Sequence, residues 1–187
     1  MRTAIARTDR YHTGAIWFHW TIAVLVIVNI LIGLFHESLL DGVKAAMPLH
    51  KSIGLLVLAL TLGMIGWRLT HRPPPLPAAM KGWEKTAAHI MHWVLYALTL
   101  IMPLTGWMMA LHSAHPKPII WFGLFQVPFL PVTHGVAGAA HESHEIIGYL
   151  MAALAVLHIA AALRHHFLLR DPVLRRMWPG LAAKAPE

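Results

Sequence analysis

Apolar residues are gathered into four long segments, separated by shorter stretches rich in proline, glycine and charged residues. A helix needs about 20 apolar residues to cross a bilayer, and its backbone groups must be hydrogen-bonded within the protein. The pattern therefore predicts an all-α membrane protein, a bundle of four transmembrane helices forming one domain over residues 1–187. The predicted helices span about 15–35, 50–69, 88–111 and 145–167.

Composition supports the membrane setting and narrows the chemistry. Of the 187 residues, 57% are hydrophobic and 12% are charged, and the mean hydropathy is +0.58, whereas a soluble domain is far more polar. The absence of cysteine excludes disulfides, iron–sulfur clusters and covalently attached c-type haem.

The net charge of +7 is unevenly distributed along the chain. Basic residues precede the first helix, link the second to the third and follow the fourth, whereas only Lys44, Lys51 and Lys117 fall on the other side of the membrane. Cytoplasmic loops are enriched in Lys and Arg, so both termini are predicted to be cytoplasmic. This distribution explains the basic charge without nucleic acid as a partner and makes membrane lipid the expected partner. The oligomeric state is left undetermined.

The sequence also predicts the structure of the segments between and after the helices. Proline at 73–75 and 77 cannot continue a helix and predicts a stiff connection between the second and third helices. The longest connection, 112–143, is expected to hold a short interfacial segment and irregular coil. Residues 168–187 are expected to form a basic amphipathic tail on the inner leaflet.

His144 and His158 lie fourteen residues apart, near the two ends of the fourth apolar segment. Fourteen residues are almost a whole number of helical turns, so both imidazoles lie on one helix face, offset by roughly 21 Å along the axis. Imidazole is costly in hydrocarbon unless it is paired or bound. The spacing therefore predicts two stacked cofactor sites at different depths.

The other helices offer partners at matching depths. Successive helices cross the membrane in opposite directions, so the position of a histidine along its helix gives its depth. His50 lies at the same outer depth as His144, whereas His19 and His92 both lie at the same inner depth as His158. The residues thus predict an outer pair, His50 with His144. They leave two choices for the inner pair, His158 with His19 or with His92.

The residue types at these pairs indicate haem rather than zinc. Zinc needs three or four close ligands, usually including carboxylate or thiolate, and the apolar segments contain neither. Paired imidazoles from different helices, with small residues nearby to admit a flat macrocycle, are typical of six-coordinate b-type haem. Two haem b groups are therefore expected. A haem-free metal transporter using the fifteen histidines is the less favoured alternative.

Short motifs in all four apolar segments resemble those of the bacterial four-helix cytochrome b-561 family. The matching stretches are Ile16–Trp20, Leu49–Gly54, Ala88–His92, Leu104–Trp107, His144–Glu145 and Leu157–Phe167, followed by Arg170–Asp171. The resemblance implies that His19 and His158 ligate the inner haem and that His50 and His144 ligate the outer one. It also implies a multi-pass protein of the bacterial inner membrane.

Within this family the chain resembles superoxide oxidases, which take electrons from superoxide at the periplasmic face and deliver them to ubiquinone. This similarity makes Lys51 a candidate catalytic residue that attracts the anion, although four carboxylates share that face. His89 and His92 become candidate catalytic proton donors in an inner quinone site. Arg68 and Arg164 are candidate cofactor-binding residues for haem propionates.

A second interpretation uses the same helices and haems. The chain is then a diheme electron-transfer subunit whose electrons come from a partner dehydrogenase or a periplasmic redox protein. The absence of extra domains favours superoxide and quinone as direct substrates over such a partner.

Overall fold

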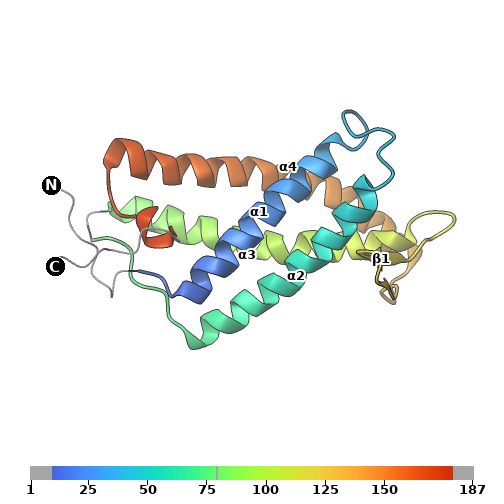
Figure 1. Ribbon diagram of the computed structural model, residues 1–187, viewed down its shortest axis with the longest axis horizontal. Coiled ribbons are helices and arrows are strands. Elements are labelled where there is room, and N and C mark those ends of the chain that lie inside the picture. Colours follow the sequence, from blue (N-terminus) through green and yellow to red (C-terminus); the bar gives the residue numbers. More distant parts are fainter. Residues whose placement is uncertain (1–9, 79, 179–187) are drawn as a thin grey trace.

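Four long antiparallel helices make up most of the computed structural model, which describes residues 10–78 and 80–178 (Figure 1). The helices are α1 (Thr13–Phe35), α2 (Ala46–Thr70), α3 (Gly82–Met108) and α4 (His134–Arg164). Each is long and apolar enough to cross a membrane. The predicted all-α bundle of four transmembrane helices is confirmed.

All four helices begin earlier than predicted, because capping residues determine where a helix begins while hydropathy marks only the part suited to lipid. At the start of α3, the Glu84 carboxylate accepts a hydrogen bond from the Lys81 backbone N–H at 3.1 Å. At the start of α4, the Thr133 hydroxyl accepts one from the Val136 N–H at 3.3 Å. The added residues of α4 are mostly small or polar, and because the helix begins at His134, His144 lies well inside it rather than at its outer boundary.

The longest connection contains a β-hairpin where irregular coil was expected. Strands β1 (Ile119–Trp121) and β2 (Phe125–Val127) pair antiparallel, with Ile119 opposite Val127. Ser52 of α2 accepts a hydrogen bond from the Phe122 N–H at 3.0 Å, which fastens the hairpin to the bundle. Strands of three residues are too short for alternation to reveal them in a sequence. This end of the bundle is called the hairpin end below.

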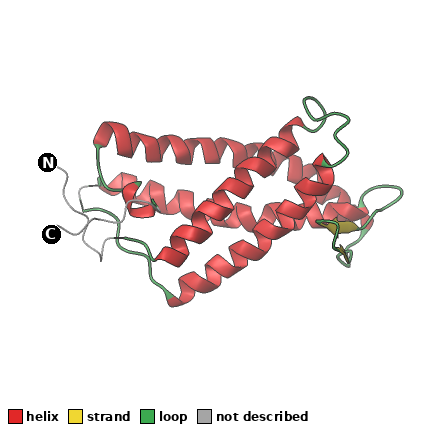
Figure 2. Cartoon of the chain, in the orientation of Figure 1, coloured by secondary structure: helices red, strands yellow, loops and turns green. Residues whose placement is uncertain are grey.

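Close backbone packing follows chain order: α1 packs on α2, α2 on α3, and α3 on α4. Helices dominate the described chain, and the two short strands lie at one end of the bundle (Figure 2). Among the described residues, α4 has no comparably close packing with α1 or α2. The buried apolar cluster of Ile22, Ile53, Val57 and Met64 lies between α1 and α2. Many other apolar side chains are exposed, such as Val156 at 67%, as expected for helices that contact lipid.

The opposite end of the bundle, called the proline-loop end, carries the connection 71–81 and the segment after α4. A π-helical turn (His165–Leu169) and the left-handed Arg170, with φ of 55°, reverse the chain direction. A 3₁₀ turn (Arg175–Met177) then packs against the bundle, with Arg176 only 4% exposed. The described part of the tail is therefore folded against the bundle. Residues 179–187 of the predicted tail, together with Arg2 and Arg7, lie outside the described residues.

Candidate functional site

At the hairpin end, the structure brings His50 of α2 and His144 of α4 together. Their ring centroids lie 6.2 Å apart, and the ring planes are inclined at 82°. Each ring rests against a glycine of another helix: a Cβ on Gly33 would lie 3.0 Å from His50 Cε1, and a Cβ on Gly106 would lie 3.0 Å from His144 Cε1. Glycine therefore lets both imidazoles approach the backbone closely.

Both rings at the hairpin end are oriented through Nδ1. His50 Nδ1 lies 3.1 Å from the Asn29 carbonyl oxygen, and His144 Nδ1 lies 2.9 Å from Thr105 Oγ1. A carbonyl can only accept, so His50 carries its proton on Nδ1. Its Nε2 is left with a free lone pair, which is the form of imidazole that binds a metal.

At the proline-loop end, His19 of α1 faces His158 of α4. Their ring centroids are 6.3 Å apart, with planes inclined at 59°. His19 Nδ1 is buried, and within the part of the chain that the structure describes it has no hydrogen-bond partner. The adjacent Trp20 ring packs edge-on against His19 at 5.5 Å, and its indole N–H donates to the Met177 carbonyl at 2.6 Å.

His92, the other candidate for the inner pair, also lies close to His158. Their centroids are 5.4 Å apart, and His92 Nδ1 donates to the Ala88 carbonyl at 2.6 Å. Two imidazoles that bind one iron from opposite sides need centroids about 6 to 6.5 Å apart, because each iron–nitrogen bond is about 2 Å long and each ring nitrogen lies about 1 Å from its centroid. The separation of His19 and His158 fits this requirement better than that of His92 and His158.

The helix packing also fits a flat cofactor between the paired rings. Both pairs join α4 to a helix with which it has no close backbone packing. Among residues 10–78 and 80–178, there is no group of three or more His, Asp or Glu side chains that could hold a metal ion. The histidine geometry therefore suits a macrocycle that supplies its own equatorial ligands better than it suits a bare metal ion.

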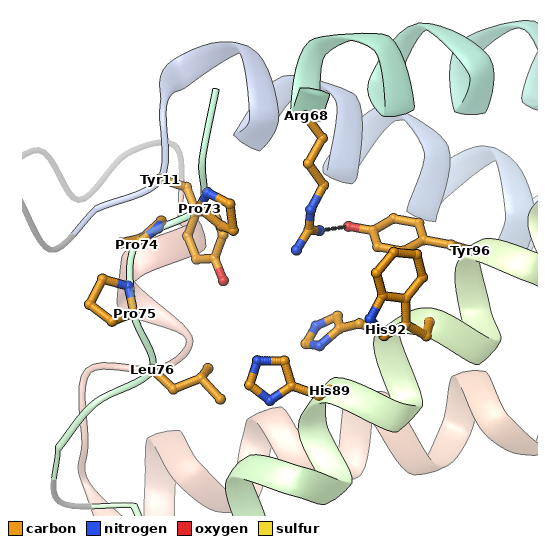
Figure 3. Close-up of a pocket in the computed structure, with 10 residues that line it drawn as sticks. Tyr11, Arg68, Pro73, Pro74, Pro75, Leu76, His89, His92 and Tyr96 are labelled. Carbon is orange, nitrogen blue, oxygen red and sulfur yellow. Dashed lines mark hydrogen bonds between the residues drawn. The ribbon is translucent and has the colours of Figure 1, made fainter. Parts of the chain in front are cut away.

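A cavity of about 180 Å³ opens at the proline-loop end, lined in part by His92, the neighbour of His158 (Figure 3). The side chains of Tyr11, Arg68, His89 and His92 point into this space. The other lining residues are Pro73, Pro74, Pro75, Leu76, Trp93 and Tyr96. The cavity thus combines an apolar wall with several hydrogen-bonding groups, as small-molecule sites do.

Polar groups in this cavity are held by specific contacts. Arg68 Nη1 donates a hydrogen bond to the Tyr96 hydroxyl, and the Arg68 guanidinium carbon lies 5.1 Å from the Tyr96 ring centroid. His89 Nδ1 donates to the Lys85 carbonyl at 2.7 Å, which leaves Nε2 on the solvent-exposed ring available. Burial raises the pKa of the Tyr11 phenol, despite the opposing charges of Arg176 and Arg68. Tyr11 therefore stays protonated at neutral pH and can donate a hydrogen bond.

The other predicted site residues lie apart from these contacts. Arg164, a candidate for a propionate, pairs with Glu84 at 3.3 Å at the proline-loop end. Lys51 follows His50 and is exposed at the hairpin end, as is Lys117. Tyr11 and Tyr96 were not predicted from the sequence as site residues. Tyr96 could have been found, because it lies four residues after His92 on the same helix face.

Comparison with known proteins places these features in a family. Residues 10–180 match the family model for prokaryotic cytochrome b561. "Cytochrome b561 homolog 2" of Escherichia coli K12 is 34% identical over 174 residues, which cover 90% of this chain and 91% of that protein. "Probable superoxide oxidase CybB" of Yersinia pestis is 28% identical, covering 91% and 96%. "Cytochrome b562" of Cereibacter sphaeroides is 32% identical, covering 87% and 90%.

Proposed function

Because the chain belongs to the prokaryotic cytochrome b561 family, an electron-transfer family whose members bind b-type haem, we propose that it is a diheme superoxide:ubiquinone oxidoreductase of the bacterial inner membrane. The observation that carries the proposal is the presence of two facing imidazole pairs, with centroid separations of 6.2 Å and 6.3 Å, at opposite ends of the bundle. His50 and His144 hold one haem b, and His19 and His158 hold the other. Haem b supplies one-electron redox chemistry to the protein.

The orientation of the protein in the membrane follows from the distribution of basic residues between the two ends of the bundle. Among the described residues, the proline-loop end carries Arg68, Arg72, Lys81, Lys85, Arg164, Arg170, Arg175 and Arg176, whereas the hairpin end has Lys44, Lys51 and Lys117. Cytoplasmic segments are the more basic ones, so the proline-loop end faces the cytoplasm. The hairpin end then faces the periplasm, where superoxide would arrive.

The overall reaction sets the requirements at each end. Two superoxide anions release two electrons and become dioxygen, and one ubiquinone takes up two electrons and two protons to become ubiquinol. At the hairpin end, the exposed ammonium group of Lys51, next to His50, attracts the anion. At the proline-loop end, the cavity beside His158 holds the quinone ring.

The residues of this cavity bind the ring and move protons. Arg68 and Tyr11 offer donors to the quinone oxygens, and the proline wall covers the ring with apolar surface. The solvent-exposed His89 takes up protons on Nε2, because its Nδ1 proton is held by the Lys85 carbonyl. His92, whose ring centroid lies 5.4 Å from that of His158, passes these protons to the quinone.

The test begins with the cofactor content of the purified protein. A pyridine haemochrome assay should give about two haem b groups per chain, and one haem or none would overturn the diheme proposal. Rapid mixing with superoxide should then reduce the haem at a rate near the diffusion limit, with ubiquinone reoxidising it. Two haems without rapid reduction by superoxide would instead support a subunit that takes its electrons from a partner protein.

A further inference from the structure

The stretch Leu104–Trp107 matches a family motif, yet the proposed function assigns it no role. We propose that the Thr105 hydroxyl orients the His144 imidazole and lowers the reduction potential of the haem at the hairpin end. Thr105 is a positioning residue in this proposal, because it acts through His144 and not on a substrate. The inference rests on the ligand assignment of the proposed function, in which His144 binds that haem.

The hydrogen-bond directions around Thr105 are determined by a neighbouring carbonyl. Thr105 Oγ1 donates its own proton to the Met102 carbonyl at 2.9 Å. At the same time Oγ1 lies 2.9 Å from His144 Nδ1, so the hydroxyl must accept this second hydrogen bond. His144 therefore carries its proton on Nδ1, and Nε2 is the nitrogen left for iron. Thr105 is only 7% exposed, so water does not readily compete for this contact.

Gly106 completes the contact with the imidazole. A Cβ at this position would lie 3.0 Å from His144 Cε1 and 3.5 Å from Nδ1, so the ring packs directly on the α3 backbone. Consecutive residues thus set two properties of His144: Gly106 sets its distance from α3, and Thr105 sets its rotation and tautomer. Thr105 and Gly106 thus act on the same imidazole in different ways.

The partner ligand is held in the same way, but by main-chain atoms. His50 Nδ1 donates to the Asn29 carbonyl at 3.1 Å, and a Cβ on Gly33 would meet the His50 ring at 3.0 Å. A main-chain acceptor cannot be removed by substitution. Among the described residues that surround the four proposed ligands, Thr105 is the one whose side chain accepts a hydrogen bond from the Nδ1 of a ligand histidine.

A hydrogen bond from Nδ1–H makes an imidazole a more basic ligand, and a more basic ligand favours ferric over ferrous iron. Both ligands at the hairpin end have this bond. At the proline-loop end, no described residue forms a hydrogen bond with His158, and His19 Nδ1 is unpartnered. The haem at the hairpin end is therefore the poorer electron acceptor of the two. This difference favours electron movement toward the proline-loop end, where the quinone cavity lies.

The experiment compares Thr105→Val, Thr105→Ser and Thr99→Val in the full-length protein with its haems. Valine has the shape of threonine but lacks the hydroxyl, whereas serine keeps the hydroxyl. Thr99 is a matched control, because it is buried in the same helix and its hydroxyl donates only to the Tyr96 carbonyl at 3.0 Å. Redox titration with optical and low-temperature EPR detection gives the potential of each haem. The haem that His144→Ala removes is the one assigned to the hairpin end.

Thr105→Val should shift the equilibrium of this haem toward the reduced form by about tenfold, or about 59 mV for one electron. Thr105→Ser and Thr99→Val should leave both potentials unchanged. An unchanged potential in Thr105→Val, or an equal shift of both haems, would overturn the proposal. Haem loss without a change in potential would also overturn it, since Thr105 would then have only a structural role. If His144→Ala keeps both haems, the ligand assignment fails instead.

Discussion

The two imidazole pairs have nearly equal separations but very different surroundings. At the hairpin end, both rings rest on glycines and are held through Nδ1 by oxygen acceptors. At the proline-loop end, His19 is buried without such a bond among the described residues, and the Trp20 indole packs against it. Hydrogen bonds therefore orient one pair, whereas packing orients the other. Sites that must bind similar groups can thus be given different redox properties by their neighbours.

The largest expected effect is the selective loss of one haem. His144→Ala should remove the haem at the hairpin end, and His158→Ala should remove the one at the proline-loop end, because each substitution deletes an axial ligand. Haem content per chain should fall to about half in both variants, with different optical and EPR signals remaining. If both variants lose the same haem, the two pairs are not separate sites.

Gly106→Val should weaken haem binding at the hairpin end by about 10- to 100-fold, because the added side chain displaces His144 from its position on α3. The measurement is haem retention during purification and titration with added haem. Gly66→Val is the matched control, since a Cβ at Gly66 meets no atom within 4 Å. Equal loss of haem in both variants would mean that valine acts on the helices in general and not on the imidazole.

Arg68→Gln should raise the KM for ubiquinone by about tenfold, because it removes a charged donor from the cavity at the proline-loop end. Reduction of the haems by superoxide should be unaffected, since the donor binds at the other end. Tyr149→Phe provides a control for a lipid-exposed aromatic, as Tyr149 is 60% exposed. An unchanged KM in Arg68→Gln would place the quinone elsewhere.

Trp20→Phe should have the smallest effect. It removes the indole N–H that donates to the Met177 carbonyl, which contributes about 1 kcal/mol to stability. The EPR signal of the haem at the proline-loop end should broaden or shift, while the other signal stays the same. Trp17→Phe, on the same helix but 63% exposed, should change neither signal. A change at the hairpin end alone would contradict the assignment of Trp20 to the inner pair.

The sequence predicted the helices well and their ends poorly. Hydropathy reports the part of a helix that lies in lipid, so it missed the first turns of α4 between His134 and Glu145, whose residues are mostly small or polar. The hairpin strands contain three residues each, which is too few for a periodic signal. The segment after α4 was expected on the membrane surface, but its contacts with Trp20 and Pro75 depend on residues more than one hundred positions away.

Sequence alone therefore determined the number of transmembrane helices, the membrane setting and which helix carries each histidine, because hydropathy and helical period are local properties of a chain. It proposed the outer pair but left His19 and His92 as equal choices on spacing. Only the tertiary structure decided which rings face each other at 6.3 Å, and only it brought Thr105 to His144 across 39 positions. Such contacts depend on how helices rotate and pack against each other, which no local pattern encodes.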